Sequence, residues 1–306
     1  DTDTDTDTDT DTDTDTDTRR VVGYLPTYRS LDPAGIDLSA LTHLNIAFAT
    51  PTGAGNEVEF VGATPAAIQA LVDAAHAEDV RVLASIGGGT GSDLVAAKLG
   101  ADNVDAFVAA LLALVARYDL DGIDVDIEGA AITTTYAPFV LALSDALGDD
   151  QLLTAAVASW NGADIPDAAL ARYDLLHVMA YDHCGTWSDA CEHAPVAAAE
   201  ADLAYWIDDR GYPADQTVLG VPFYGYCWGG ACPASTLTYA ELLARWPAAA
   251  NTDWLTGDGY EISLNSAATI GVKAAMAEDY GGLMIWELGQ DAAGADSLLG
   301  VVAGAR

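Results

Sequence analysis

Short runs of β-branched and apolar residues alternate along the chain with longer, alanine-rich stretches. Eight short runs predict strands: Val21–Leu25, Leu44–Ala49, Val80–Ile86, Gly122–Glu128, Leu152–Ala158, Leu175–Tyr181, Val218–Tyr224 and Gly282–Leu288. Several intervals between them show the apolar periodicity of amphipathic helices, as in Pro65–Glu78, Val104–Tyr118, Pro138–Leu147, Val196–Arg210 and Ala268–Tyr280. Strands separated by helices pair in parallel through right-handed crossovers, so eight such units predict a closed (β/α)8 barrel, the TIM barrel.

An open, doubly wound sheet is the structural alternative to the barrel. It would favour a Gly-x-Gly-x-x-Gly phosphate turn after the first strand, and none is present there. Gly87-Gly88-Gly89 ends the third predicted strand but is a weak phosphate motif on its own. The interval from Gly225 to Gly281 shows two helical patterns and a short polar loop, so no clear α+β insertion is expected between the seventh and eighth strands.

The first 18 residues are nine Asp-Thr repeats. Neither face of this alternating pattern is apolar, and like charges at every second position repel one another. We therefore expect residues 1–18 to be a disordered linker and residues 19–306 to be the folded domain. A linker at this position, without a signal peptide, suggests a piece of a longer precursor with a substrate-binding module upstream.

The composition excludes several classes of protein. At 51% hydrophobic residues the chain can bury a sizeable core, and its apolar runs are too short for a membrane span. The formal net charge is −36 and the only lysines are Lys98 and Lys273, which argues against a nucleic-acid partner.

The acidic character extends beyond the repeat. With nine of the 47 acids in the repeat, 38 acids against 11 bases remain in residues 19–306, a charge of −27. This excess of aspartate with almost no lysine resembles the surfaces of proteins from halophilic archaea, where salt screens dense negative charge. An ordinary acidic secreted protein is the alternative.

The four cysteines form two close pairs in sequence, Cys184 with Cys191 and Cys227 with Cys232. Two local disulfides in surface loops are the simplest interpretation, and they indicate an oxidising, extracellular location. A zinc site is the alternative, because His183 and His193 flank the first pair. Its spacing is not the Cys-x-x-Cys common in structural zinc sites.

Polar and aromatic residues concentrate near the ends of the predicted strands. In a (β/α)8 barrel the active site lies at the carboxyl ends of the strands. The residues concerned are Ser85, Asp124, Asp126, Glu128, Trp160, Met179, Tyr181, Asp182, Tyr224 and Trp286.

The fourth predicted strand holds three carboxylates at a period of two. Side chains alternate across a strand, so Asp124, Asp126 and Glu128 should point into the barrel. Ile123 and the other apolar residues that alternate with these acids should point outward, towards the helices. Crowding and desolvation favour protonation of at least one of these acids. Such an arrangement suits a site that holds a proton on an acid at neutral pH.

Metal binding is the other use for three such acids. A calcium loop needs a flexible backbone and an acid at its twelfth position, but Ile and Val separate these acids and the twelfth position is Thr135. Magnesium ligands of the enolase kind would come from successive strands rather than from one strand. We therefore expect neither a metal nor a cofactor.

The motif Asp121-Gly122-Ile123-Asp124-Val125-Asp126-Ile127-Glu128 resembles the Asp-Gly-x-Asp-x-Asp-x-Glu motif of glycoside hydrolase family 18, the chitinases and their relatives. Ser85-Ile86-Gly87-Gly88 is similar to the family's third-strand Ser-x-Gly-Gly, and Met179-Ala180-Tyr181-Asp182 to its sixth-strand Met-x-Tyr-Asp. Gly23-Tyr24 and Asn45-Ile46-Ala47-Phe48 resemble its first two strands, and Gly281 to Leu288 its last. The resemblance runs from about Val21 to the C-terminus.

The resemblance implies a role for each matching residue. Glu128 is the general acid and later the base, and the substrate's own N-acetyl group is the nucleophile, which makes this family an exception to the two-carboxylate scheme. Asp126 orients the acetamide, Asp124 shares its proton, and Tyr181 binds the acetamide oxygen. Trp286 stacks under the sugar. Further substrate contacts are expected from Asp182, Met179, Tyr224, Trp160 and Tyr24.

The leading hypothesis is a secreted, monomeric chitinase that acts on chitin or chitooligosaccharides, with a carbohydrate-binding module upstream. Without an insertion its groove should be shallow, which favours endo cleavage. An endo-β-N-acetylglucosaminidase acting on glycoprotein glycans is the second hypothesis. The third is a lectin-like member that binds chitin without cleaving it, but such proteins typically lose the glutamate that Glu128 matches.

Overall fold

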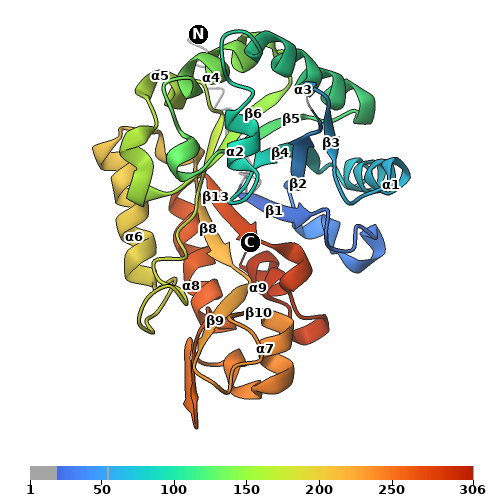
Figure 1. Cartoon of the computed structure of the whole chain (residues 1–306). Helices are drawn as coiled ribbons and strands as arrows, with labels where there is room; N and C mark the ends of the chain where they lie inside the picture. Colours follow the sequence, from blue (N-terminus) through green and yellow to red (C-terminus); the bar gives the residue numbers. More distant parts are fainter. Residues whose placement is uncertain (1–18, 54, 306) are drawn as a thin grey trace, which may run out of the picture.

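Eight parallel strands form a closed barrel in the computed structural model, which describes residues 19–53 and 55–305 (Figure 1). The barrel strands, each next to its neighbour in the sheet, are β1 (Arg20–Pro26), β2 (His43–Pro51), β4 (Arg81–Gly87), β5 (Gly122–Asp126), β6 (Leu152–Val157), β7 (Leu175–Val178), β8 (Thr217–Pro222) and β13 (Gly282–Trp286). β1 pairs with both β2 and β13, which closes the barrel. The Asp-Thr repeat lies outside the described residues, so the linker stays a prediction.

Helices surround the barrel (Figure 1). They are α1 (Pro65–His76), α2 (Ser92–Ala96), α3 (Val104–Tyr118), α4 (Tyr136–Ala146), α5 (Asp167–Leu170), α6 (Val196–Ala204), α8 (Ala267–Met276) and α9 (Leu298–Gly304), with a π-helical turn at Tyr205–Asp209. Short 3-10 turns lie at Pro33–Gly35, Leu38–Ala40, Gly129–Ala131, Ser159–Asp164, Ala214–Gln216, Pro247–Ala250, Ala277–Asp279, Leu288–Gln290 and Gly294–Asp296. None of the described helices is long and apolar enough to cross a membrane.

Local sequence fixes several helix ends. α1 begins at Pro65, and the hydroxyl of Thr64 accepts a hydrogen bond from the backbone N–H of Ala67 at 3.2 Å. α3 ends at Tyr118, and the capping residue Asp119 has a φ of 57°, the left-handed conformation that terminates helices.

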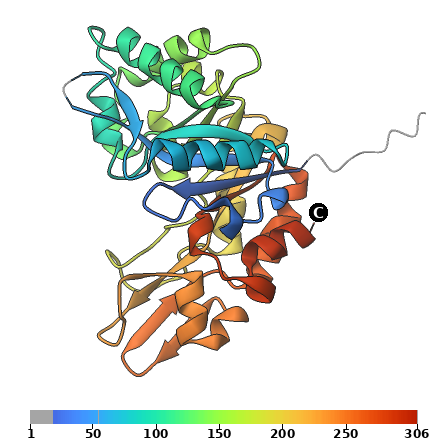
Figure 2. The same ribbon diagram turned by 90° about the vertical axis from the view of Figure 1, so that its right-hand side faces the viewer.

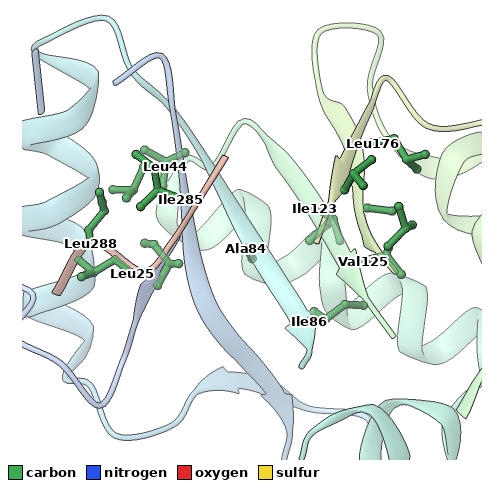
Figure 3. Packing of buried hydrophobic residues seen from close by; sticks show 14 of the residues in the cluster. Leu25, Leu44, Ala84, Ile86, Ile123, Val125, Leu176, Ile285 and Leu288 are labelled. Atoms are coloured by element: carbon green, nitrogen blue, oxygen red, sulfur yellow. The ribbon is translucent and has the colours of Figure 1, made fainter. Parts of the chain in front are cut away.

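The main hydrophobic core lies between the strands and the surrounding helices. Figure 3 shows residues of this layer from β1, β2, β4, β5, β7 and β13, among them Ile123 and Val125 of β5 and Leu176 of β7. These three side chains are fully buried. Because strand side chains alternate, the same strands direct their remaining residues into the barrel, where the carboxylates lie.

The eight predicted barrel strands are all present, with small differences at their ends. β7 ends at Val178, so Met179 to Asp182 follow the strand. Tyr224 does not end the seventh barrel strand, because β8 stops at Pro222 and Tyr224 begins a separate strand.

The region between β8 and β13 corrects the prediction that no α+β insertion is present. A second, antiparallel sheet of order β10-β9-β12-β11 lies there, together with α7 (Tyr239–Arg245). Its strands are β9 (Tyr224–Trp228), β10 (Thr236–Thr238), β11 (Trp254–Gly257) and β12 (Tyr260–Ser263). Figures 1 and 2 both place β9 and α7 on the opposite side of the barrel from α3 and α4.

The strands of this inserted sheet are three to five residues long, which is too short for a clear apolar pattern. One indication was present in the sequence. Asp258-Gly259 joins β11 to β12 as a two-residue hairpin turn, with Gly259 at φ +81°. A further short strand, β3 (Val58–Phe60), pairs antiparallel with β2 and was also not predicted.

Candidate active site

The alternation along β5 places its carboxylates inside the barrel, as predicted. Asp124 is 0% exposed and Asp126 is 4% exposed, while Ile123, Val125 and Ile127 belong to the outer core. Glu128 follows two residues after the strand ends and is partly buried. The three acids therefore run from the barrel interior towards the carboxyl ends of the strands.

Asp124 is saturated with hydrogen bonds. Its Oδ2 accepts from Tyr24 Oη at 2.8 Å and Ser85 Oγ at 2.7 Å, and its Oδ1 accepts from Thr154 Oγ1 at 2.7 Å. The Nδ1 atom of His177 lies 3.3 Å from Oδ1. Burial by itself would raise the pKa of Asp124, but His177, Thr154 and Ser85 together hold that pKa below its ordinary value.

Asp126 has the opposite environment. Its Oδ1 is buried and has no hydrogen-bond partner among the described residues. Burial, followed by the negative charges of Glu128 and Asp124, raises the pKa of Asp126 well above its ordinary value. The pKa values of these adjacent inward-facing acids are thus displaced in opposite directions, which favours the charged form of Asp124 and the protonated form of Asp126.

Glu128 has the properties of a general acid. Burial and then the charge of Asp182 raise its pKa. Its backbone N–H donates to Ser92 Oγ at 3.0 Å, and Ser92 Oγ lies 2.8 Å from the carbonyl oxygen of Gly88. Ser92, near the start of α2, therefore connects the backbone of Glu128 to the end of β4.

The Gly87-Gly88 pair allows β4 and β5 to approach closely at the site. Gly87 has φ +105°, and a Cβ there would lie 2.1 Å from the carbonyl oxygen of Asp126. Gly88 has φ +74°, its N–H donates to the same oxygen at 2.7 Å, and its Cβ would lie 2.4 Å from the ring of Phe48. Any larger residue would displace the backbone of Asp126 or the Phe48 ring.

The segment after β7 brings aromatic and acidic side chains to the same edge. Tyr181 is 8% exposed, and its hydroxyl lies 4.0 Å from Met284 Sδ. The ring of Tyr224 meets Tyr181 edge to face at 6.3 Å, and its hydroxyl donates to Asp182 Oδ1. Asp182 adopts a left-handed φ of 61°, and its side chain is 39% exposed.

Trp286 is the last residue of β13 and is partly exposed. Its ring stacks on Phe48 with centroids 5.9 Å apart and also contacts the ring of Tyr24. Tyr24 itself is 1% exposed and donates to Asp124, so the structure places it beneath the carboxylates instead of on an open sugar-binding surface.

A cavity of about 410 Å³ lies beside the segment that follows β7. Trp160 lies at its edge with its side chain largely open to solvent, and the lining residues are Ser159, Trp160, Met179, Tyr181, Asp182, His183, Asp202 and Tyr205. The predicted residues Trp160, Met179, Tyr181 and Asp182 thus meet in one cavity next to the carboxylates.

Both predicted disulfides are present, between Cys184 and Cys191 and between Cys227 and Cys232. They occupy all four cysteines, so the alternative of a cysteine zinc site is wrong. In the residues 19–53 and 55–305, no group of three or more His, Cys, Asp or Glu side chains is placed to hold a metal ion.

The first disulfide loop packs on the inserted sheet. Trp187, inside the loop, meets the ring of Tyr226 at 5.3 Å and remains 67% exposed. Trp228 Nε1 lies 3.1 Å from two carbonyl oxygens of the loop, those of Gly185 and Ser188. The inserted sheet and the loop thus present aromatic side chains close to Asp182.

Two buried histidines in the site were not predicted. His177 lies inside the barrel beside Asp124. His193 contacts the rings of Tyr224 and Tyr226, its Nδ1 lies 3.4 Å from Asp182 Oδ1, and burial lowers its pKa. The period of two places His177 on the same strand face as Met179, so the sequence pattern could have identified it.

Comparisons with known proteins agree with this geometry. A family model described as glycosyl hydrolases family 18 matches residues 20–291. The chitinase ChiB of Flavobacterium johnsoniae is 33% identical, with a TM-score of 0.84 over 94% of this chain and 93% of that one. A chitinase from Cycas revoluta, solved in complex with (GlcNAc)4, shares the fold at 23% identity, with a TM-score of 0.81 over 94% of this chain and 99% of that chain.

Among curated proteins, a chitinase-like effector from Moniliophthora perniciosa is 28% identical over 74% of this chain. The alignments with this relative and with the next two cover 59%, 45% and 58% of the relatives' lengths. The chain therefore spans about half the length of the curated relatives that it matches.

Proposed function

The chain belongs to family 18 of the glycosyl hydrolases, and we propose that it is a chitinase that cleaves β-1,4 bonds between N-acetylglucosamine units with net retention. The observation that supports this best is the trio of acids along β5. Glu128 has a raised pKa at the open end, Asp126 next to it has a pKa raised well above its ordinary value, and Asp124 beneath them has a lowered pKa.

In the proposed reaction, protonated Glu128 transfers its proton to the glycosidic oxygen as the bond to the anomeric carbon breaks. The carbonyl oxygen of the substrate's own acetamide bonds to that carbon and gives an oxazolinium ion. Asp126 orients the acetamide, and the neutral hydroxyl of Tyr181 donates to its oxygen. Carboxylate Glu128 then takes a proton from water, which attacks the anomeric carbon and releases the retained product.

Substrate contacts follow from the exposed surfaces of the site. Trp286 supplies an aromatic face for the sugar next to Phe48, and Asp182, Met179 and Tyr224 surround the same edge. We propose endo cleavage because Trp160, 77% exposed, extends the binding surface beyond Tyr181. Because the inserted sheet is present, the absence of an insertion does not support endo cleavage in this chain.

The setting of the enzyme belongs to the same proposal. Two disulfides suit an oxidising environment, so we propose a secreted, monomeric enzyme with a carbohydrate-binding module upstream of the Asp-Thr repeat. The charge of −27 in residues 19–306 suits a salt-rich medium like that of halophilic archaea.

The test is hydrolysis of colloidal chitin and chitooligosaccharides by the purified chain and by Glu128→Gln. Loss of the acid should lower kcat by a factor of about 100 to 10,000 while chitooligosaccharide binding persists. Asp189→Asn, which changes an exposed acid in the first disulfide loop, is the matched control and should retain activity. Product lengths on colloidal chitin distinguish endo from exo cleavage.

Two outcomes would overturn the chitinase proposal. Glycan release from a glycoprotein without any cleavage of chitin would identify an endo-β-N-acetylglucosaminidase. Binding of chitooligosaccharides by the wild-type chain without cleavage of either substrate would identify a lectin-like protein.

A further inference from the structure

A histidine lies directly beneath the reacting acids, at a position that the proposed reaction does not use. His177 is on β7 and is 1% exposed. Its Nδ1 lies 2.9 Å from Tyr24 Oη and 3.3 Å from Asp124 Oδ1. Its Nε2 is buried and has no hydrogen-bond partner among the described residues.

The hydrogen bonds of its neighbours determine which ring nitrogen holds the proton. Tyr24 has one hydroxyl proton, and the oxygen of Asp124 at 2.8 Å can only accept it. The Tyr24 oxygen can then only accept from Nδ1 of His177. A bare Nδ1 would direct its lone pair at Tyr24 and at the negative Asp124 Oδ1 together, which is unfavourable.

The other nitrogen supports the same assignment. An imidazolium, or a ring protonated at Nε2, would bury an N–H group without an acceptor among the described residues, whereas a ring protonated only at Nδ1 leaves no proton on Nε2. The neutral Nδ1–H tautomer is therefore the one that matches every contact around the ring.

We infer that His177 is a positioning residue: as the neutral Nδ1–H tautomer it directs the Tyr24 proton to Asp124 and keeps Asp124 anionic, so that the proton of the acid pair stays on Asp126. This inference rests on the proposed hydrolase function. The titratable groups that face His177 are Tyr24 from β1, His43 from β2 and Asp124 from β5. Among them, Asp124 is the group whose pKa the His177 donor lowers, so loss of that donor should raise the pKa of Asp124.

The consequence for the reaction concerns the location of one proton. With Asp124 anionic, a second negative charge on Asp126 is unfavourable, so Asp126 retains a proton that it can donate towards Glu128 or the acetamide. Without the Nδ1 donor, Asp124 becomes the better base, and the proton moves away from the reacting edge.

Two variants test this role through the pH profile. His177→Leu removes the donor, and we expect a fall in kcat of about tenfold with little change in KM, and an acidic limb of kcat/KM displaced upward by about one pH unit. His177→Asn places an amide N–H close to the position of Nδ1, so the acidic limb of its kcat/KM profile should stay at the wild-type pH. An activity loss in both variants without movement of the acidic limb would reduce His177 to a packing role and overturn the inference.

A measurement on the wild-type chain tests the tautomer without any variant. Nitrogen-15 NMR of the histidine-labelled protein should show His177 protonated at Nδ1 and bare at Nε2, and a proton on Nε2 would overturn the inference. This result does not depend on catalysis. Absence of hydrolysis by the wild-type chain would reject the proposed function, while the NMR result would still decide the proton's location.

Discussion

At the scale of single residues, environment distinguishes three acids that the sequence presents as equivalent. Asp124, Asp126 and Glu128 differ in the donors and charges around them rather than in their own chemistry. Four polar side chains face Asp124, while a buried oxygen of Asp126 has no partner among the described residues. Their pKa directions follow from these contacts.

The charge of Asp182 should control the upper pH limit of activity. Asp182 contributes to the raised pKa of Glu128, so Asp182→Asn should lower that pKa. The acid form of Glu128 is then lost at lower pH, and the alkaline limb of kcat/KM should move downward by about half a unit to one unit. Asp189→Asn removes an exposed charge from the adjacent loop and should leave the limb in place. An unmoved limb in Asp182→Asn would contradict this electrostatic role.

At the scale of elements, the inserted sheet and the first disulfide loop support each other. β9 directs Tyr224, Tyr226 and Trp228 to one face, as its period of two requires. Tyr224 contacts Asp182, Tyr226 contacts Trp187, and Trp228 binds the loop backbone. The residues after β7 are therefore held in place by a sheet 40 to 43 positions further along the chain.

A buried lysine connects α8 to the segment that follows the first disulfide loop. Lys273 is 0% exposed, and its Nζ lies 2.9 Å from both the carbonyl oxygen of Ala194 and Oδ1 of Asn265. Burial lowers the pKa of Lys273 from 10.5 to about 8. Between these two values the unfolded chain binds more protons than the folded chain, so this residue makes folding stability rise with pH.

We therefore expect Lys273 to add about 2 kcal/mol to the free energy of unfolding between pH 8 and pH 10. Lys273→Met should lose that increase relative to wild type in urea denaturation at the two pH values. Lys98→Met, at the chain's second lysine, is the matched control and should keep the increase. If the free energy of unfolding rises equally with pH in wild type and in Lys273→Met, the pKa of Lys273 is not lowered.

At the scale of the whole molecule, the dominant feature is the excess of acids. Only a few of the acids behind the charge of −27 in residues 19–306 belong to the site. Exposed acids that are adjacent in sequence, such as Asp149 with Asp150 and Asp208 with Asp209, repel one another. Salt shortens the range of this repulsion from about 30 Å at 0.01 M to about 3 Å at 1 M.

Stability should therefore increase with potassium chloride over that range. Urea denaturation at each salt concentration measures the increase, and sucrose, which carries no charge, separates screening from general solute exclusion. Changing Asp149, Asp150, Asp208 and Asp209 to Asn should flatten the dependence. A free energy of unfolding that does not change between low and high salt would contradict the proposed adaptation.

Sequence periodicity was sufficient to predict the barrel. Each barrel strand is a short, mainly apolar run, and along β5 apolar residues alternate with acids, a pattern that is visible without knowledge of the strand's partners. The same alternation placed Asp124 and Asp126 inside and Ile123 and Val125 outside. It failed for the inserted sheet, because its strands are too short for a pattern and are stabilised by contacts with each other and with the loop after β7.

The sequence by itself determined the order of strands and helices, the face of β5 that bears the acids and the positions of the cysteines. These properties depend on neighbours along the chain, where the geometry of a strand fixes which side each residue occupies. Only the tertiary structure decided which acid has a lowered pKa and which a raised one, that Tyr24 and His177 meet Asp124, and that Lys273 binds Ala194. Hydrogen bonds and charges act through space, so residues distant in sequence set the chemistry of each acid.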